Sequence, residues 1–460
     1  MKSKLIGDRA FYRRALMFAV PIMIQNGITN FVNMLDNLMV GTVGTEAVTG
    51  VAVANQLVFI FNLCIFGAVS GAGIFTAQFH GKGDIKGVQY TFRFKLAFSV
   101  LISLLFCFIV YVKGDYLLGL YLKGEGTAET AKMSAEIARD YILIMLIGVI
   151  PYAISQSYGA TLRETDRPKV PMYAGITAVL VNLVLNYTLI FGHFGFARMG
   201  AQGAAVATVA SRFVELIYVT LSAHIGKKSA FIVGIFKSLY IPIALIKKMI
   251  IKGAPLLINE FLWSLGIAFI NQCYSLRGLS VVAGVNIALT FFNVFSVVFM
   301  SVGLSIGIIV GQMLGSGKTD EAMDTAVKMR AFSVFTGVTI GILFALSAGV
   351  IPNLYNTTDE VKYLAKWFMI LWAMAMPIDA FAHSSYFTLR SGGKVLITLV
   401  FDSFFVWIVS VPFAFFVSRY TNLPILPFFA LSEVLNILKC VLGYIYVKKG
   451  SWIKNLTAES

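Results

Sequence analysis

The sequence predicts an all-α polytopic membrane protein with 12 transmembrane helices in two pseudo-symmetric six-helix lobes. Three observations lead to this fold class: a low charge content, a series of long apolar runs, and an internal repeat. Of the 460 residues, 58% are hydrophobic and 13% are charged, whereas an average soluble domain is roughly a quarter charged. So few charges cannot cover the surface of a soluble protein of this length, and lipid must be the main solvent.

The apolar runs define the helices, because about 20 residues of helix cross the ~30 Å hydrocarbon core of a bilayer. None of the runs alternates at every second residue over about ten residues, as the strands of a membrane β-barrel do. The predicted helices lie near residues 15–40, 48–78, 92–112, 138–160, 169–191, 201–224, 250–275, 280–312, 327–350, 362–388, 394–417 and 425–447.

An internal repeat divides these helices into two groups of six. The tetrapeptide Ala97–Val100 recurs as Ala331–Val334 in the second half of the chain. An even number of helices per repeat keeps both halves in the same orientation, with the symmetry axis along the membrane normal. We therefore predict an N-lobe at 1–224, a cytoplasmic linker at 225–249 and a C-lobe at 250–460. Four further pairs have the same separation in sequence as the tetrapeptides: Pro21 and Pro255, Gln78 and Gln312, Gly81 and Gly315, Gly83 and Gly317.

The basic residues predict the orientation. Of the 37 Lys and Arg residues, 26 fall on the side of the N-terminus, 9 fall on the other side, and Arg212 and Lys439 lie within spans. Positive charges concentrate in cytoplasmic loops, so both termini are expected to be cytoplasmic in a bacterial cytoplasmic membrane. The net charge of +15 follows from these short basic clusters, none of which is long enough to track a nucleic acid.

Three carboxylates within the spans are the candidate functional groups: Asp36, Glu260 and Asp379. A charged side chain at the bilayer centre costs roughly 2.5–3.5 kcal/mol, so it is expected to be functional. Asp36 ends a polar stripe on one helix face, and His383 lies one turn after Asp379, where an ion pair is a hypothesis. The alternative is that such stripes only join helices through hydrogen bonds.

Five other charged residues in the spans are interpreted as structural. Arg212 and Glu215 are three residues apart on one helix, so they are expected to pair with each other. Glu433 and Lys439 are six residues apart, which disfavours a direct pair. Asp402 lies near the predicted cytoplasmic end of its span, where it is expected to reach interfacial water.

The sequence contains no recognisable catalytic set, so an enzyme is not predicted. The turns at 81–84 and 315–318 lack the spacing of a phosphate-binding loop. The four cysteines lie separately within apolar runs and form no CxxC or Cys/His cluster. No cofactor is therefore expected, and the energy source for transport is expected to be an ion gradient.

The order of several segments resembles the multidrug and toxic compound extrusion (MATE) family, bacterial and in part NorM-like, over essentially the whole chain. The resemblance implies two six-helix lobes, alternating access, and export of cationic amphipathic compounds in exchange for Na+ or H+. It also implies a monomer in the lipid bilayer that binds small organic cations. The segments that carry it are Pro21–Gly41, Gln78–Asp84, Leu162–Met172, Asn182–Gly195, Gly200–Arg212 and Pro377–Arg390.

The resemblance also implies site residues. Asn186 stands where one subgroup of the family has Asp, and Glu260 lies about one turn nearer Pro255 than the family pattern places it. A Na+ site is implied at Asp36 or at Glu260 and Asp379. The implied cation or proton site of the N-lobe comprises Asp36, Asn182, Asn186 and Thr208, and the implied substrate or cation site of the C-lobe comprises Glu260, Asp379 and His383.

Other functions are alternatives to the export of organic cations. A flippase of lipid-linked oligosaccharide or polyprenyl precursors would need cationic side chains in its cavity to hold pyrophosphate. The central candidates here are carboxylates, which favour a cationic cargo. A channel or a membrane receptor is a different class, which uphill transport would distinguish, and an intramembrane enzyme ranks last.

Overall fold

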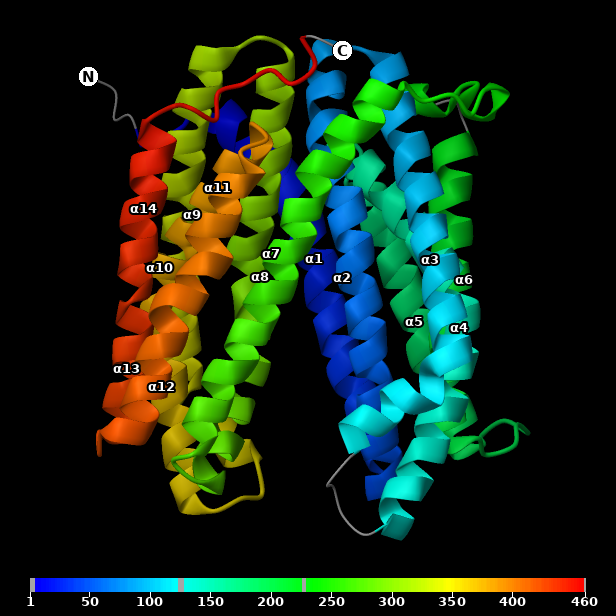
Figure 1. Cartoon of the computed structure of the whole chain (residues 1–460), viewed down its shortest axis with the longest axis vertical. Helices are drawn as coiled ribbons and strands as arrows, with labels where there is room; N and C mark the ends of the chain where they lie inside the picture. Colours follow the sequence, from blue (N-terminus) through cyan, green and yellow to red (C-terminus); the bar gives the residue numbers. More distant parts are fainter. Residues whose placement is uncertain (1–4, 123–127, 226–228, 459–460) are drawn as a thin grey trace. The chain divides into compact units, whose positions relative to one another are not determined.

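The computed structural model describes residues 5–122, 128–225 and 229–458, and within them it contains helices and no strands. Twelve helical segments in this part of the chain are long and apolar enough to cross a membrane, which confirms the predicted fold class. The first six are α1 (Arg9–Gly41), α2 (Thr45–Lys82), α3 (Ile85–Leu122), α4 (Ala128–Glu164), α5 (Lys169–Phe191) and α6 (Gly200–His224) (Figure 1).

The second half of the chain begins with four continuous helices and ends with two interrupted spans. Short turns of 3₁₀-helix lie at η2 (Ala230–Ile232), η3 (Ile235–Lys237) and η4 (Ile351–Leu354). The continuous helices are α7 (Ile243–Ser275), α8 (Leu279–Gly315), α9 (Thr319–Ser347) and α10 (Asp359–Ser391). The interrupted spans are α11 (Val395–Leu399), η5 (Val400–Phe404), η6 (Val406–Ser410) and α12 (Val411–Tyr420), followed by α13 (Ile425–Val434) and α14 (Asn436–Lys448).

Several helices are longer than their apolar runs, because their end turns lie where polar side chains are tolerated. The helix expected near 92–112 extends over 85–122, and α7 begins at Ile243, within the segment predicted as the linker. At the start of α10, Thr358 Oγ1 accepts a hydrogen bond from the Val361 amide at 3.4 Å. Such a cap satisfies one of the amides that the first helical turn leaves free.

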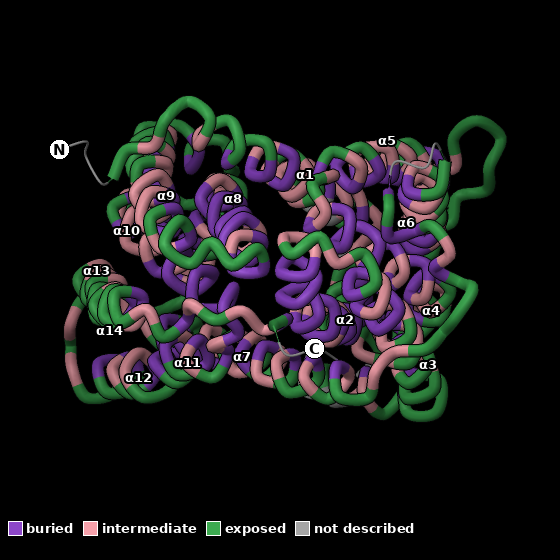
Figure 2. Tube along the Cα trace, turned by 90° about the horizontal axis from the view of Figure 1, so that it is seen from above, coloured by how far each residue is buried: buried purple, intermediate pink, exposed green. Residues whose placement is uncertain are grey.

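The chain divides into two compact units. Unit 1 comprises residues 1–23, 77–84 and 254–460, and unit 2 comprises residues 24–76 and 85–253. In unit 1, α8 and α10 supply much of the buried core, whereas α13 and α14 carry many exposed apolar residues (Figure 2). In unit 2, α6 packs against both α4 and α5. The second half of the chain thus shares unit 1 with the first turns of α1 and the last turns of α2.

A reciprocal contact within unit 1 joins the end of α2 to the end of α8. A Cβ atom added at Gly81 would overlap the backbone carbonyl of Gln312, and one added at Gly315 would overlap that of Gln78. Gly81 with Gly315, and Gln78 with Gln312, are pairs that the internal repeat predicts. The contact is therefore symmetric, and both helices approach so closely because glycine has no side chain.

The C-terminal segment after α14 also contacts the end of α2. Gln78 Nε2 donates to the carbonyl oxygens of Ser391, at 3.0 Å, and Lys454, at 3.2 Å. Gln78 Oε1 accepts from the Leu456 amide at 2.7 Å. Trp452 is fully buried. The buried Gln78 amide thereby fixes the C-terminal segment to the end of α2, and Lys82 Nζ adds a hydrogen bond to the Thr457 carbonyl at 2.8 Å.

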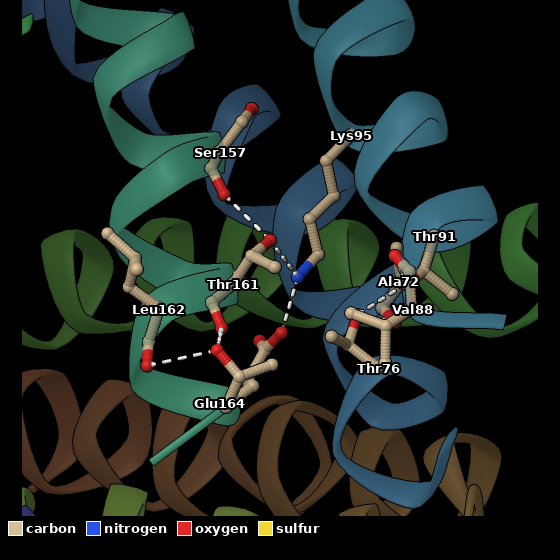
Figure 3. A network of polar contacts seen from close by, with 10 residues as sticks. Ala72, Thr76, Val88, Thr91, Lys95, Ser157, Thr161, Leu162 and Glu164 are labelled. Carbon is tan, nitrogen blue, oxygen red and sulfur yellow. Dashed lines mark hydrogen bonds and ion pairs between the residues drawn. The ribbon is translucent and has the colours of Figure 1, made fainter. Parts of the chain in front are cut away.

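A buried ion pair links α3 to α4 in unit 2. Lys95 is fully buried, and its ammonium group donates to the Glu164 carboxylate and, at 3.1 Å, to Thr161 Oγ1 (Figure 3). The carboxylate fits beside Gly73, where a Cβ atom would overlap it. A buried charge with a partner and further hydrogen bonds avoids the high cost of an isolated one. This pair therefore fixes how α3 and α4 pack.

Candidate functional site

The four residues predicted for the N-lobe site come together in unit 2. Asn186 Nδ2 donates to Asp36 Oδ1 at 2.5 Å. The side-chain amide of Asn182 lies 3.1 Å from Asn186 Nδ2 and 3.4 Å from Thr208 Oγ1. The two asparagines are four residues apart on α5, so their amides lie on one helix face. Helices α1, α5 and α6 thus each contribute to one polar site.

Amide groups surround the Asp36 carboxylate in this site. The hydrogen bonds place the nitrogen of the Asn182 amide toward Asp36, 3.2 Å from both carboxylate oxygens. Asn186 is fully buried, and its Oδ1 has no hydrogen-bond partner among the described residues. A carboxylate and an amide oxygen are ligands that hard cations prefer.

A phenol that sequence reasoning missed lies beside this site. Tyr141 of α4 is buried, and it interacts with Thr208 and with the charge of Asp36. Nothing in its spacing indicates this, because a tyrosine in an apolar run is an ordinary core residue. Asn33 and Asn37 belong to the polar stripe on α1 that includes Asp36. Their side chains are not among those that the structure describes.

The residues predicted for the C-lobe site lie in unit 1 but do not form one contact cluster. His383 Nδ1 lies 3.0 Å from the backbone oxygen of Asp379, not from its carboxylate. The ring of His383 instead meets Phe299 edge to face, with 5.8 Å between centroids. The hypothesis of an ion pair between His383 and Asp379 is therefore wrong. The cause is local: a side chain one turn along a helix reaches the preceding carbonyl.

An ion pair that sequence reasoning missed lies among these residues. Lys439 Nζ is 2.6 Å from Asp402 Oδ1, and Asn259 Nδ2 donates to Asp402 Oδ2 at 3.0 Å. The charge of Asp402 acts on Glu260, and the charge of Lys439 acts on Asp379. The interpretation that Asp402 reaches interfacial water is therefore replaced by a side-chain partner from α14.

The other charged residues in the spans also have partners. Glu433 accepts hydrogen bonds from Trp372 Nε1 at 3.1 Å and Asn436 Nδ2 at 3.3 Å. Arg212 lies over the ring of Tyr152, with 4.9 Å from its guanidinium carbon to the ring centroid. Glu215 interacts electrostatically with Arg212, as its spacing predicted, and also with Arg163. These contacts support the structural interpretation of Arg212, Glu215 and Glu433.

Comparison with known proteins gives consistent similarities along the chain. A "Probable multidrug resistance protein NorM" of Thermotoga maritima is 26% identical over 457 residues, which cover 97% of this chain and 95% of the relative. A "Probable multidrug resistance protein YoeA" of Bacillus subtilis is 26% identical over 432 residues, which cover 90% and 89%.

Solved structures share the fold. An outward-facing multidrug resistance MATE family transporter of the MOP superfamily superposes with a TM-score of 0.88 at 17% identity, covering 98% of both chains. A MOP superfamily transporter from Pyrococcus furiosus superposes with a TM-score of 0.86 at 16% identity, covering 97% of this chain and 98% of the other. At these identities the superpositions show the fold alone.

The family itself is established by a match to most of the sequence. The MatE family model matches residues 21–188 and 255–416. The two matched segments correspond to the two halves that the internal repeat defines. The chain therefore belongs to the MatE family of multi-pass membrane transporters.

Proposed function

We propose that the chain is a secondary active antiporter that exports cationic amphipathic compounds in exchange for Na+ or H+ by alternating access. The observation that carries this proposal is the N-lobe site, where Asp36 faces the two α5 amides. The multidrug resistance names of the relatives agree with it. We also propose that the transporter is a monomer, as the resemblance to the family implies.

Asp36 supplies the charge that ion exchange needs. Its carboxylate accepts a hydrogen bond from Asn186 Nδ2 at 2.5 Å, and the Asn182 amide nitrogen lies 3.2 Å from both of its oxygen atoms. A cation bound to this carboxylate would replace these donors, whereas a proton on Asp36 removes the charge and with it the attraction for a metal ion. Ion and cargo then affect each other's binding reciprocally.

We assign the cargo side of the exchange to Glu260, Asp379 and His383 of the C-lobe. A carboxylate away from water attracts an organic cation strongly, because screening there is weak. The alternative flippase needs free cationic groups for pyrophosphate. Lys439 of this region already faces Asp402, and the charge of Arg390 acts on Glu260. The balance of charge thus favours a cationic cargo.

The test is gradient-driven transport by the purified protein in liposomes loaded with a cationic dye such as ethidium. A Na+ gradient and a pH gradient are imposed separately. We expect dye movement against its own gradient with at least one of them, and dissipation of that gradient by an ionophore should stop it. Passive equilibration of the dye with neither gradient having an effect would contradict the proposal and would favour a channel.

Replacement of Asp379 tests the cargo site. We expect Asp379→Asn to weaken binding of ethidium in detergent, because the carboxylate charge is lost and the side-chain size is kept. A neutral dye of similar size should bind nearly as well as to the unchanged protein, and Glu260→Gln should have a similar or smaller effect than Asp379→Asn. Fluorescence titration gives both affinities. Equal loss for the cationic and the neutral dye would assign these acids to packing instead.

We also propose the topology: both termini and the linker between the N-lobe (1–224) and the C-lobe (250–460) face the cytoplasm of a bacterial cell. The linker packs on α3, where Arg93 Nε donates to the Ile235 carbonyl at 3.0 Å. Leu239 in this segment is 78% exposed. In a variant without the native cysteines, Leu239→Cys should react with a membrane-impermeant thiol reagent in opened cells only. Strong labelling of intact cells would reverse the orientation.

A further inference from the structure

We propose that Lys439 is a tethered cation for the Asp402 carboxylate of the C-lobe, so that Asp402 binds no metal ion while this lysine is present. The proposal deepens the proposed function, on which it rests, by separating the roles of the lobes. The N-lobe site at Asp36 takes the exchanged ion, and the C-lobe carries its own permanent cation. Lys439 thus determines the ion specificity of the C-lobe.

The carboxylate of Asp402 is held by an ammonium group on one oxygen and by an amide nitrogen, Asn259 Nδ2, on the other. Lys439 Nζ lies 2.6 Å from Asp402 Oδ1 and is the cation in direct contact with that carboxylate. Ser403 Oγ donates to the backbone oxygen of Asn259 at 2.6 Å and to its Oδ1 at 2.8 Å. These bonds fix Asn259, whose amide nitrogen faces Asp402, and the Asp402 carboxylate is the kind of oxygen ligand that hard cations prefer.

The backbone around Asp402 and Lys439 departs from regular α-helix. Asp402 lies in η5, a turn of π-helix within the eleventh span, and α14 packs against η5. Turns of this kind are frequent at functional sites. On the other side, the helix is interrupted at Leu435, between α13 and α14, four residues before Lys439. Both partners of the ion pair are therefore on irregular helices.

The internal repeat gives an independent comparison. In the register that aligns Arg163 with Arg390, Arg212 corresponds to Lys439 and Tyr152 corresponds to Asp379. In unit 2, Arg212 lies over the ring of Tyr152. In each half, a cation on the sixth helix (Arg212 or Lys439) thus acts on the corresponding position of the fourth helix. In the N-lobe this position is Tyr152, and in the C-lobe it is Asp379, on which the charge of Lys439 acts.

The charges in this region explain why a tethered cation is needed. Lys439 is in contact with Asp402 and acts electrostatically on Asp379 and Glu433. Arg390 acts on the fourth acid, Glu260. Without Lys439, Asp402 would lose the cation in contact with it, and Asp379 and Glu433 would lose its electrostatic effect. A mobile monovalent cation or a proton would then be drawn to Asp402 Oδ1, the oxygen that Lys439 now contacts.

The experiment measures saturable binding of ²²Na+ to the purified full-length protein in detergent. All variants carry Asp36→Asn, which removes the N-lobe carboxylate. We expect no saturable binding of sodium by this parent protein. After Lys439→Met is added to it, we expect binding of about one sodium ion per chain. A third change, Asp402→Asn, should abolish the new binding. The matched control is Lys448→Met, since Lys448 lies on the same helix but is exposed, and it should bind nothing.

Two results would overturn the proposal. One is sodium binding by the Asp36→Asn parent that disappears on Asp402→Asn, because Lys439 would then not exclude the ion. The other is a monodisperse Lys439→Met variant that binds no more sodium than its parent. If Lys439→Met is not monodisperse, Lys439→Gln replaces it, since glutamine keeps a hydrogen-bond donor for Asp402. Binding is measured without cargo or gradient, so a failure of transport leaves this test unaffected.

Discussion

Asp36→Asn is expected to abolish gradient-driven efflux while leaving the protein folded and inserted. The substitution keeps the side-chain size, and the new amide oxygen still accepts from Asn186, which now lies 2.5 Å from Asp36 Oδ1. It removes the charge that binds the exchanged ion, and an amide cannot take up a proton at ordinary pH. Efflux of ethidium from liposomes should therefore fall to the level measured without an imposed gradient.

The matched control for this prediction is Asp140→Asn. Asp140 is also paired with an amide, since Gln202 Nε2 donates to its Oδ2 at 2.9 Å, but it lies on the exposed side of α4. This variant should transport at the unchanged rate. Normal transport by Asp36→Asn at matched protein levels would show that the ion is exchanged elsewhere in the chain.

Gly81→Ala is expected to destabilise unit 1 strongly. The added methyl group would overlap the backbone carbonyl of Gln312, and a backbone atom cannot be moved by changing a rotamer. Overpacking of this kind costs about 1–3 kcal/mol and occasionally more. Gly315→Ala should behave in the same way, because its methyl group would meet the Gln78 carbonyl. Thermal unfolding in detergent, followed by size-exclusion chromatography, measures both effects.

Gly119→Ala is the control, since no atom lies within 4 Å of its Cβ position near the end of α3. There the substitution should be neutral or stabilising, because alanine is favoured over glycine in a helix by roughly 0.5–1 kcal/mol. Equal melting temperatures for Gly81→Ala and Gly119→Ala would mean that α2 and α8 are not held in close contact.

The sequence alone predicted the fold class because lipid imposes simple rules on it. Length, apolarity and the distribution of lysine and arginine locate each span, and the constant separation of the repeated residues pairs the halves. The ends of the helices were harder to predict: α3 continues to Leu122, well beyond its apolar run. The π-helical turns of η5 and η6 were not predicted, since no residue type marks them.

The two candidate sites differed in how far they could be predicted. Asn182 and Asn186 are one turn apart on one helix, so their joint position follows from the spacing once the resemblance points to Asp36. Asp402 and Lys439 are 37 residues apart on different helices. Their pairing depends on how those helices pack and on the interruption of the helix at Leu435. The spacing of apolar residues in the sequence predicts neither.

The hydrogen bonds of Gln78 have a consequence for the timing of folding. Its oxygen accepts from a residue 378 positions later, and its nitrogen donates to residues 313 and 376 positions later. At synthesis rates of about 5–20 residues per second, the last of these partners emerges on the order of 20–80 s after Gln78 itself. During that interval the amide has only water or lipid headgroups to bind. The end of α2 therefore reaches its final structure only after Leu456 has been synthesised, and in a nascent chain stalled before Lys454 the hydrogen bonds of Gln78 to Lys454 and Leu456 are missing.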